Sequence, residues 1–157
     1  EPLIKGVATR VMSLRDGSKK MSKSDASDAS RINLTDSPDL ITTKLQKSKT
    51  DSIAEITYDP STRAEISNLI NIFSALSGSS TELIVENYRG KGFAKFKADL
   101  ADIIISKLKP INDEYTKIIK DKSYIQEVLT SGAERARAVA QATCIRVKDQ
   151  LGLILNN

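Results

Sequence analysis

Apolar residues recur at helical spacing through most of the chain. Between Thr62 and Gly78, five apolar side chains fall on one helical face: Ile66, Leu69, Ile70, Phe73 and Leu76. A longer stripe follows between Gly92 and Lys120, made of Phe93, Phe96, Leu100, Ile103, Ile104, Leu108, Ile111, Tyr115 and Ile118. Such stripes are typical of helices that bury one face, so the pattern predicts a mainly α protein with a helical bundle.

Residues that favour helix ends accompany these stripes. Ser37 and Pro38 suit the N-cap and the first position of one helix, and Gly78 and Gly90 suit helix stops. The spacing of a capping box occurs at Thr62–Glu65, Ser79–Glu82, Ser123–Gln126 and Ser131–Glu134. We therefore expect helices to begin at each of these four places, with two separate helical pieces after residue 120.

The two ends of the helical region carry further signals. Pro110 lies inside the stripe 92–120 and is expected to kink or divide that helix, because its nitrogen cannot donate a backbone hydrogen bond. The last helix, expected at about 133–151, has an alanine-rich face that permits close helix packing. Its other face carries Arg135, Arg137, Arg146 and Lys148. These charges fit a solvated face or a contact with phosphate.

The first 37 residues have a different pattern. We expect residues 2–14 to end in a strand, with Val7, Val11, Met12 and Leu14 as strand residues, followed by a turn at Arg15–Gly17. Residues 18–37 are rich in Ser, Asp and Lys and show little periodicity. They predict a long loop, and long loops in compact domains are usually functional or disordered.

Composition narrows the chemistry that the chain can perform. The 157 residues are 39% hydrophobic and 28% charged, with a net charge of +4 that is compatible with an anionic partner. One cysteine and no histidine exclude a disulfide within the chain, a zinc site of the usual ligands, and Ser–His or Cys–His catalysis. No apolar stretch approaches a membrane span, and no signal peptide leads the chain. Because the chain begins at Glu1 without Met, we expect a piece of a longer protein.

The loop GSKKMSKSD, residues 17–25, is the strongest candidate for chemistry. It holds three lysines and three serines, and a lysine ammonium is a flexible point charge that suits phosphate oxygens. It is not a Walker-type loop, which needs Gly, four residues, and then Gly-Lys-Ser/Thr. On these residues alone, two interpretations remain open: a phosphate-binding loop and an ordinary basic surface loop.

Residues 20–24 spell KMSKS, the second signature of class I aminoacyl-tRNA synthetases. The stretch RVMSLRDGSKKMSKSD resembles the tryptophanyl branch of that family, in its bacterial and organellar form. The segments INLTDSPDLITTKL, YDP, ISNLINIFSALSG, YRGKGFAKFKADLAD, LKPI and GAERARAVAQAT follow in the order typical of the family. The resemblance extends from about Gly6 to Leu153.

The resemblance implies roles for residues of the loop. Lys20 and Lys23 would bind the triphosphate of ATP and stabilise the pyrophosphate leaving group. Ser22 and Ser24 would donate to phosphate, Met21 would lie near the adenosine, and Val11 would contact adenine through its backbone. Many members have D-P-T where this chain has D-G-S, so Gly17 would make the loop floppier.

The resemblance also implies an architecture. Residues 1–36 would be the last strand and KMSKS loop of a Rossmann-like α/β catalytic domain. Residues 37–157 would be a helical domain that binds the tRNA anticodon, with its last helix packed back towards the catalytic domain. The other class I signature, HIGH, needs histidine and cannot occur here, so this chain alone is expected to be inactive.

The implied activity is ATP-dependent ligation of tryptophan to tRNA(Trp), with Mg²⁺ on the phosphates and no metal site in the chain itself. The full-length protein would be a homodimer in the bacterial cytoplasm or an organellar matrix, without a membrane partner. Candidates for tRNA contact, on charge alone, are Arg89, Lys91, Lys95 and Arg135. The alternatives are a tyrosyl-tRNA synthetase and a helical module that binds RNA without catalysis.

Overall fold

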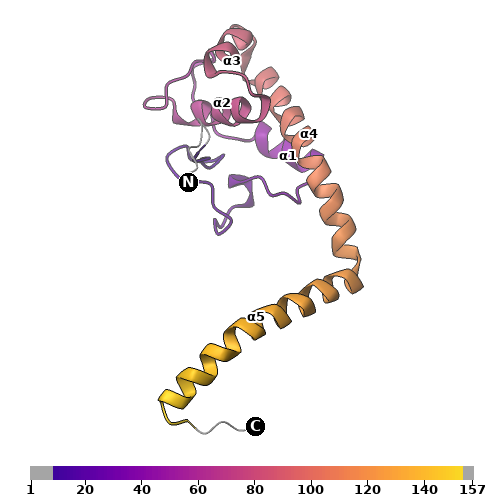
Figure 1. Ribbon diagram of the computed structural model, residues 1–157. Helices are drawn as coiled ribbons and strands as arrows, with labels where there is room; N and C mark the ends of the chain where they lie inside the picture. Colours follow the sequence, from indigo (N-terminus) through magenta and orange to yellow (C-terminus); the bar gives the residue numbers. More distant parts are fainter. Residues whose placement is uncertain (1–8, 154–157) are drawn as a thin grey trace. The chain divides into compact units, whose positions relative to one another are not determined.

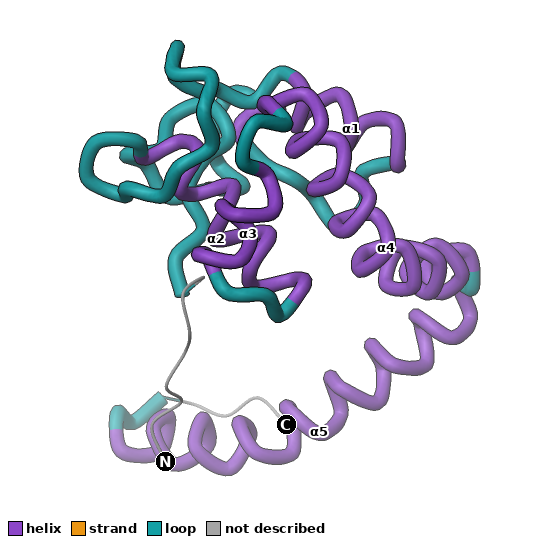
Figure 2. Tube along the Cα trace, turned by 90° about the horizontal axis from the view of Figure 1, so that it is seen from above, coloured by secondary structure: helices purple, strands orange, loops and turns teal. Residues whose placement is uncertain are grey.

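A computed structural model describes residues 9–153, and they are mainly helical (Figures 1 and 2). The elements are η1 (Asp28–Ser30), α1 (Pro38–Gln46), α2 (Ala64–Ser77), α3 (Thr81–Tyr88), α4 (Gly92–Lys120) and α5 (Lys122–Gln150). The chain forms two compact units, the first ending at Asn112 and the second beginning at Asp113. The mainly helical prediction is therefore confirmed for the described residues.

The hydrophobic core of the first unit lies where α1, α2, α3 and α4 meet. α2 carries most of the predicted stripe into it, since Ile66, Leu69 and Ile70 are buried. The rings of Phe73, Tyr88 and Phe96 pack together, with centroids 5.1–5.7 Å apart. Edge-to-face and offset aromatic pairs add to the stability that burial provides. This core fixes the positions of α1 and α2, the two helices that hold the segments on either side of the KMSKS loop.

The predicted strand is not formed by the described residues. Residues 9–153 contain only an isolated antiparallel bridge between Met12 and Lys20, and residues 2–8 of the prediction lie outside the described part. The reason lies in the partners of the Met12 and Leu14 backbone groups. Met12 bonds to the side chain of Asn68, and Leu14 bonds to the backbone of Ser30 and Lys49, so no neighbouring strand is paired.

The predicted helix ends are right at some places and wrong at others. Ser37 caps α1, where its side chain accepts a hydrogen bond from the Leu40 N–H, and Gly78 ends α2 in the left-handed conformation. The box at Thr62 does not form, because its hydroxyl donates to Asp59 and the helix begins at Ala64. The cap of α3 is Ser80, one residue after the predicted position.

Two expected divisions of the long helices do not occur. α4 continues through Pro110 without division. The carbonyl of residue 106 that loses its donor belongs to an exposed residue, so water can replace the missing hydrogen bond. α5 is one helix rather than two, because Asp121 caps its start and the chain remains helical through Ser131.

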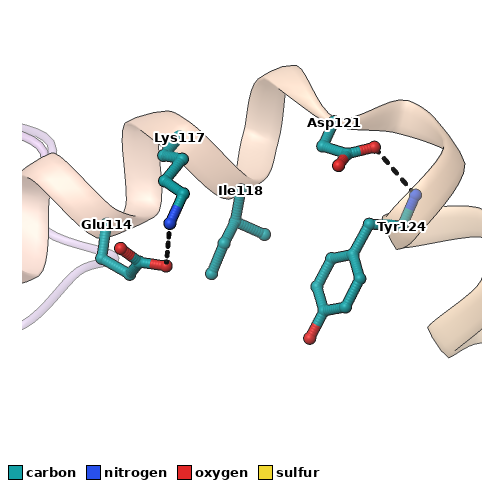
Figure 3. Close-up of a pocket in the computed structure, with 5 residues that line it drawn as sticks. All are labelled: Glu114, Lys117, Ile118, Asp121 and Tyr124. Carbon is teal, nitrogen blue, oxygen red and sulfur yellow. Dashed lines mark hydrogen bonds and ion pairs between the residues drawn. The ribbon is translucent and has the colours of Figure 1, made fainter.

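The second unit contains the end of α4 and all of α5. Figure 3 shows the turn between them, where the Asp121 carboxylate accepts a hydrogen bond from the Tyr124 N–H at 3.0 Å. A cavity of about 250 Å³ lies beside this turn, and its single lysine, Lys117, is 3.5 Å from Glu114. α5 has no buried residue. The packing of the last helix against a catalytic domain stays a prediction.

Candidate functional site

The segment before the KMSKS loop is held in place by α2. Asn68, a buried residue of α2, accepts a hydrogen bond from the Met12 N–H at 2.9 Å and donates to the Met12 carbonyl at 3.0 Å. A side-chain amide that bonds both backbone groups of one residue acts as a neighbouring strand would. The N-terminal end of the loop is thus fixed to the helical core.

A tight turn at Asp16 begins the loop. The Ser18 hydroxyl and N–H donate to the Asp16 carboxylate at 2.6 and 3.1 Å, and the Lys19 ammonium lies 3.3 Å from it. These hydrogen bonds, those of Ser18 first, lower the pKa of Asp16 to about 2. Lys19 is therefore engaged locally by a carboxylate that stays ionised at neutral pH.

Gly17 has a different role from the one the sequence suggested. It is buried, and a Cβ atom built on it would lie 2.8 Å from the backbone of Ala64 and of Glu65, at the start of α2. Real Cβ atoms do not approach backbone so closely. The prediction that Gly17 makes the loop floppier is replaced by a packing role, in which the missing side chain lets the loop lie against α2.

Lys20 and Lys23 are exposed, and neither forms an ion pair with any described residue. Lys19 differs from these two lysines, because its ammonium has the Asp16 carboxylate as a partner. The Ser22 hydroxyl accepts a hydrogen bond from the Ser24 N–H at 3.2 Å, which leaves its own proton available for donation. The loop thus presents two uncompensated ammonium groups beside two hydroxyls.

Val11 and Met21 lie next to each other at one side of the loop. The Met21 N–H donates to the Val11 carbonyl at 3.0 Å. Both side chains line an open apolar cavity of about 220 Å³, whose other lining residues are Ile32, Leu34, Ile72, Ala75, Leu76, Ile104 and Leu108. A flat apolar group could pack there while a charged group attached to it reached the lysines.

The C-terminal side of the loop is tied to α1. The Lys44 ammonium lies 2.6 Å from a carboxylate oxygen of Asp28 and 2.6 Å from one of Asp36. Burial acts to lower the pKa of Lys44, but the hydrogen bonds and charges of the two carboxylates outweigh burial and raise it. The hydrogen bond from Lys44 also lowers the pKa of Asp28. Lys44 and Asp28 are therefore charged together at neutral pH.

Three of the four candidates for tRNA contact lie around the turn between α3 and α4. Arg89 pairs with Glu86 at 2.8 Å, Lys95 pairs with Asp99 at 2.6 Å, and the Lys91 ammonium lies 5.7 Å from the centre of the Tyr88 ring. Arg135 is an exposed residue of α5 in the second unit. Their role in binding RNA stays a prediction.

Sequence reasoning missed the residues that position the loop. Asn68 had a detectable signal, because it is a polar residue between apolar positions of a helical stripe. Lys44 and Asp28 had none, since charged residues in a helix and in a polar loop are normally solvated. Their partnership becomes visible only in three dimensions.

Within residues 9–153, no three His, Cys, Asp or Glu side chains gather as they would around a metal ion. None of the helices in that range combines the length and apolar character that a membrane crossing requires.

Comparison with known proteins defines the class to which this loop and helical body belong. A family model described as tRNA synthetases class I (W and Y) matches residues 2–109, more than half of the chain, so the chain belongs to that family. Similar proteins of Rickettsia conorii and Brucella melitensis are both named tryptophan–tRNA ligase. They are 54% and 44% identical over 99% of this chain, which spans 47% and 44% of their lengths.

Solved structures have the same fold. A tryptophanyl-tRNA synthetase of Campylobacter jejuni, complexed with ADP and tryptophan, matches with a TM-score of 0.73 at 24% identity. One of Mycoplasma pneumoniae matches with a TM-score of 0.67 at 25% identity. Each match covers 92% of this chain and 44% of the other chain. The chain thus spans about half the length of the relatives it matches.

Proposed function

We propose that the full-length protein is a tryptophan–tRNA ligase. By the full-length protein we mean this chain together with a segment that corresponds to the part of its relatives that the chain does not span. Membership of the class I family and the 44–54% identity to proteins with that name support the assignment. The observation that carries it is the state of the loop. Lys20 and Lys23 are exposed without an acidic partner in the described part, on a loop fixed at both ends.

The reaction is activation of tryptophan and its transfer to tRNA(Trp). A carboxylate oxygen of tryptophan attacks the α-phosphorus of ATP, and the bond from that phosphorus to the bridging oxygen of pyrophosphate breaks. Negative charge develops on the departing pyrophosphate, where Lys20 and Lys23 stabilise it because they are positive and held near the site. The product is tryptophanyl-adenylate. A hydroxyl of the terminal ribose of the tRNA then attacks its carbonyl carbon, so that the tryptophanyl group is transferred to the tRNA and AMP leaves.

The residues around the loop fit ATP in one orientation. The adenine would lie over the apolar cavity beside Val11 and Met21, with the triphosphate directed towards the lysines. Ser22 and Ser24 supply hydroxyl donors for the phosphate oxygens. Mg²⁺ would accompany ATP on its phosphates, where it neutralises charge as the lysines do.

Further parts of the proposal concern partners of the full-length protein. Arg89, Lys91, Lys95 and Arg135 would contact the tRNA backbone, and such contacts weaken steeply with salt. The last strand of a Rossmann-like domain would form from the segment before the loop when the other half of the protein is present. A homodimer and a cytoplasmic or organellar-matrix location complete the proposal.

The test is ATP–pyrophosphate exchange by the full-length protein and its lysine variants. Lys23→Ala should lower the exchange rate about 30- to 1000-fold, which is about 2–4 kcal/mol for loss of one preorganised charge. Lys19→Ala is the matched control, because Lys19 already has Asp16 as a partner and should matter less. An unchanged rate in Lys23→Ala would contradict the proposal.

A further inference from the structure

The buried ammonium of Lys44 joins two carboxylates that belong to different parts of the fold. The side chain of Lys44 is only 4% exposed, and that of Asp36 is 5% exposed, whereas Asp28 is 52% exposed. Asp36 directly precedes the cap of α1, the helix that carries Lys44. Asp28 begins η1, four residues after the KMSKS motif. One lysine therefore connects the helical body to the end of the loop.

The Lys44–Asp36 contact belongs to the helical body. Both side chains are almost fully buried, and the Asp36 carboxylate also accepts hydrogen bonds from the N–H of Asn33 at 2.9 Å and from its side-chain amide at 3.1 Å. Removal of Lys44 would leave the buried Asp36 carboxylate without an ion-pair partner, and removal of Asp36 would leave the buried Lys44 ammonium with only the exposed carboxylate of Asp28. Both changes are destabilising. A variant at Lys44 or Asp36 would thus disturb the fold as well as the loop.

The Lys44–Asp28 contact belongs to the loop. Asp28 also accepts from the Asn33 side chain at 2.9 Å and lies 3.0 Å from the Arg31 guanidinium, so its carboxylate has partners on three sides. Its exposure means that water can solvate the residue that replaces it. A change at Asp28 can therefore release the loop and leave the Lys44–Asp36 pair in place.

The part of the loop that carries Lys23, residues 22–27, is exposed. The hydrogen bonds of these residues run from Ser24 and Asp25 to Ser22, from Ser27 to Asp25, from Ser30 to the Ser27 carbonyl, and from Arg31 to the carbonyls of Asp25 and Ser27. The position of Lys23 thus depends on where the ends are held. Asn68 holds the first end and Lys44 holds the second.

We propose that Lys44 is a positioning residue that acts through Asp28 to hold the C-terminal end of the KMSKS loop, and so sets where Lys23 can reach. The role of Lys23 in this statement rests on the proposed function. The anchor itself does not, because it is a property of the fold. The two parts can therefore be tested separately.

The anchor is tested on the chain itself by limited trypsin cleavage of Asp28→Asn. Cleavage after Lys23 should become about five- to tenfold faster, because loss of a charge-assisted hydrogen bond makes local opening more frequent. Cleavage after Lys91, in the turn between α3 and α4, serves as the internal reference. Asp102→Asn is the matched control, because Asp102 is an exposed carboxylate of α4 that has no interaction within the described part. Equal cleavage rates after Lys23 in both variants would overturn the anchor.

The positioning role is tested by exchange kinetics of the full-length protein. Asp28→Asn should lower kcat about three- to tenfold with an unchanged melting temperature. If the effect passes through Lys23, the same change should have little further effect in a Lys23→Ala background. An unchanged kcat in the single variant, or full additivity in the double variant, would overturn the positioning role. A wild-type protein without exchange would overturn the proposed function and leave the cleavage result to decide the anchor.

Discussion

Replacement of Arg63 by Met should destabilise the first unit strongly. The Arg63 guanidinium is 6% exposed and donates five hydrogen bonds, two of them to the two carboxylate oxygens of Asp51 at 2.7 and 2.9 Å. The other three go to the carbonyls of Ile53 and Glu55 and to the hydroxyl of Thr57. One side chain therefore orders residues 51–57 and the start of α2, the helix that holds the KMSKS loop.

The size of the effect follows from how far water can replace these contacts. Removal of one partner from a fully buried ion pair costs about 3–5 kcal/mol. Asp51 is 27% exposed and residues 53 and 55 are exposed, so part of this loss is recovered by hydration. We expect Arg63→Met to lower the free energy of unfolding by about 2–4 kcal/mol and the melting temperature by about 10 °C or more.

Urea denaturation followed by circular dichroism at 222 nm measures this change. Arg89→Met is the matched control, because Arg89 is 67% exposed and pairs only with Glu86, three residues earlier in the chain. The control should remain within about 0.5 kcal/mol of the parent chain. A loss below about 0.5 kcal/mol in Arg63→Met would refute the argument that this guanidinium organises the segment.

Two further predictions concern the same unit. Gly17→Ala should lower the free energy of unfolding by about 1–3 kcal/mol in urea titrations, because its Cβ would meet the backbone of α2, whereas Gly132→Ala in α5, with open space around it, should cause no loss. On acidification, stability should be full above about pH 5 and decline below it. The reason is that hydrogen bonds lower the folded-state pKa values of three carboxyl groups: Arg63 acts on Asp51, Lys49 on Glu65, and Lys95 on Asp99. Urea midpoints measured from pH 6 to pH 3 check the sign, and a midpoint that rises with acid would contradict it.

Local signals in the sequence predicted those helix ends that local contacts determine. Ser37 caps α1 through a hydrogen bond to a residue three positions away, and Gly78 ends α2 through its own backbone conformation. The start of α2 was missed by one or two residues because Asp59 engages Thr62, and Arg63 is held by Asp51, twelve residues earlier. A capping pattern cannot anticipate such competition.

The chemistry of the loop was more predictable than its support. Five consecutive residues identified the KMSKS motif, and the family assignment agrees with that interpretation. Asn68 reaches Met12 across 56 positions, and Lys44 joins Asp28 across sixteen. Contacts between residues so far apart in the chain produce no periodic pattern in a single sequence, and the same holds for the packing of Gly17 against α2. Contacts of this kind depend on the folded core rather than on local propensity.

The central claim is tested most directly by the amino-acid dependence of ATP–pyrophosphate exchange. The full-length protein should exchange label between pyrophosphate and ATP when tryptophan is present, and should do so far more slowly with tyrosine or with no amino acid. This chain alone should show no exchange under the same conditions. Exchange that depends on tyrosine would assign the protein to the other branch of its family, and no exchange with either amino acid would contradict the proposed function.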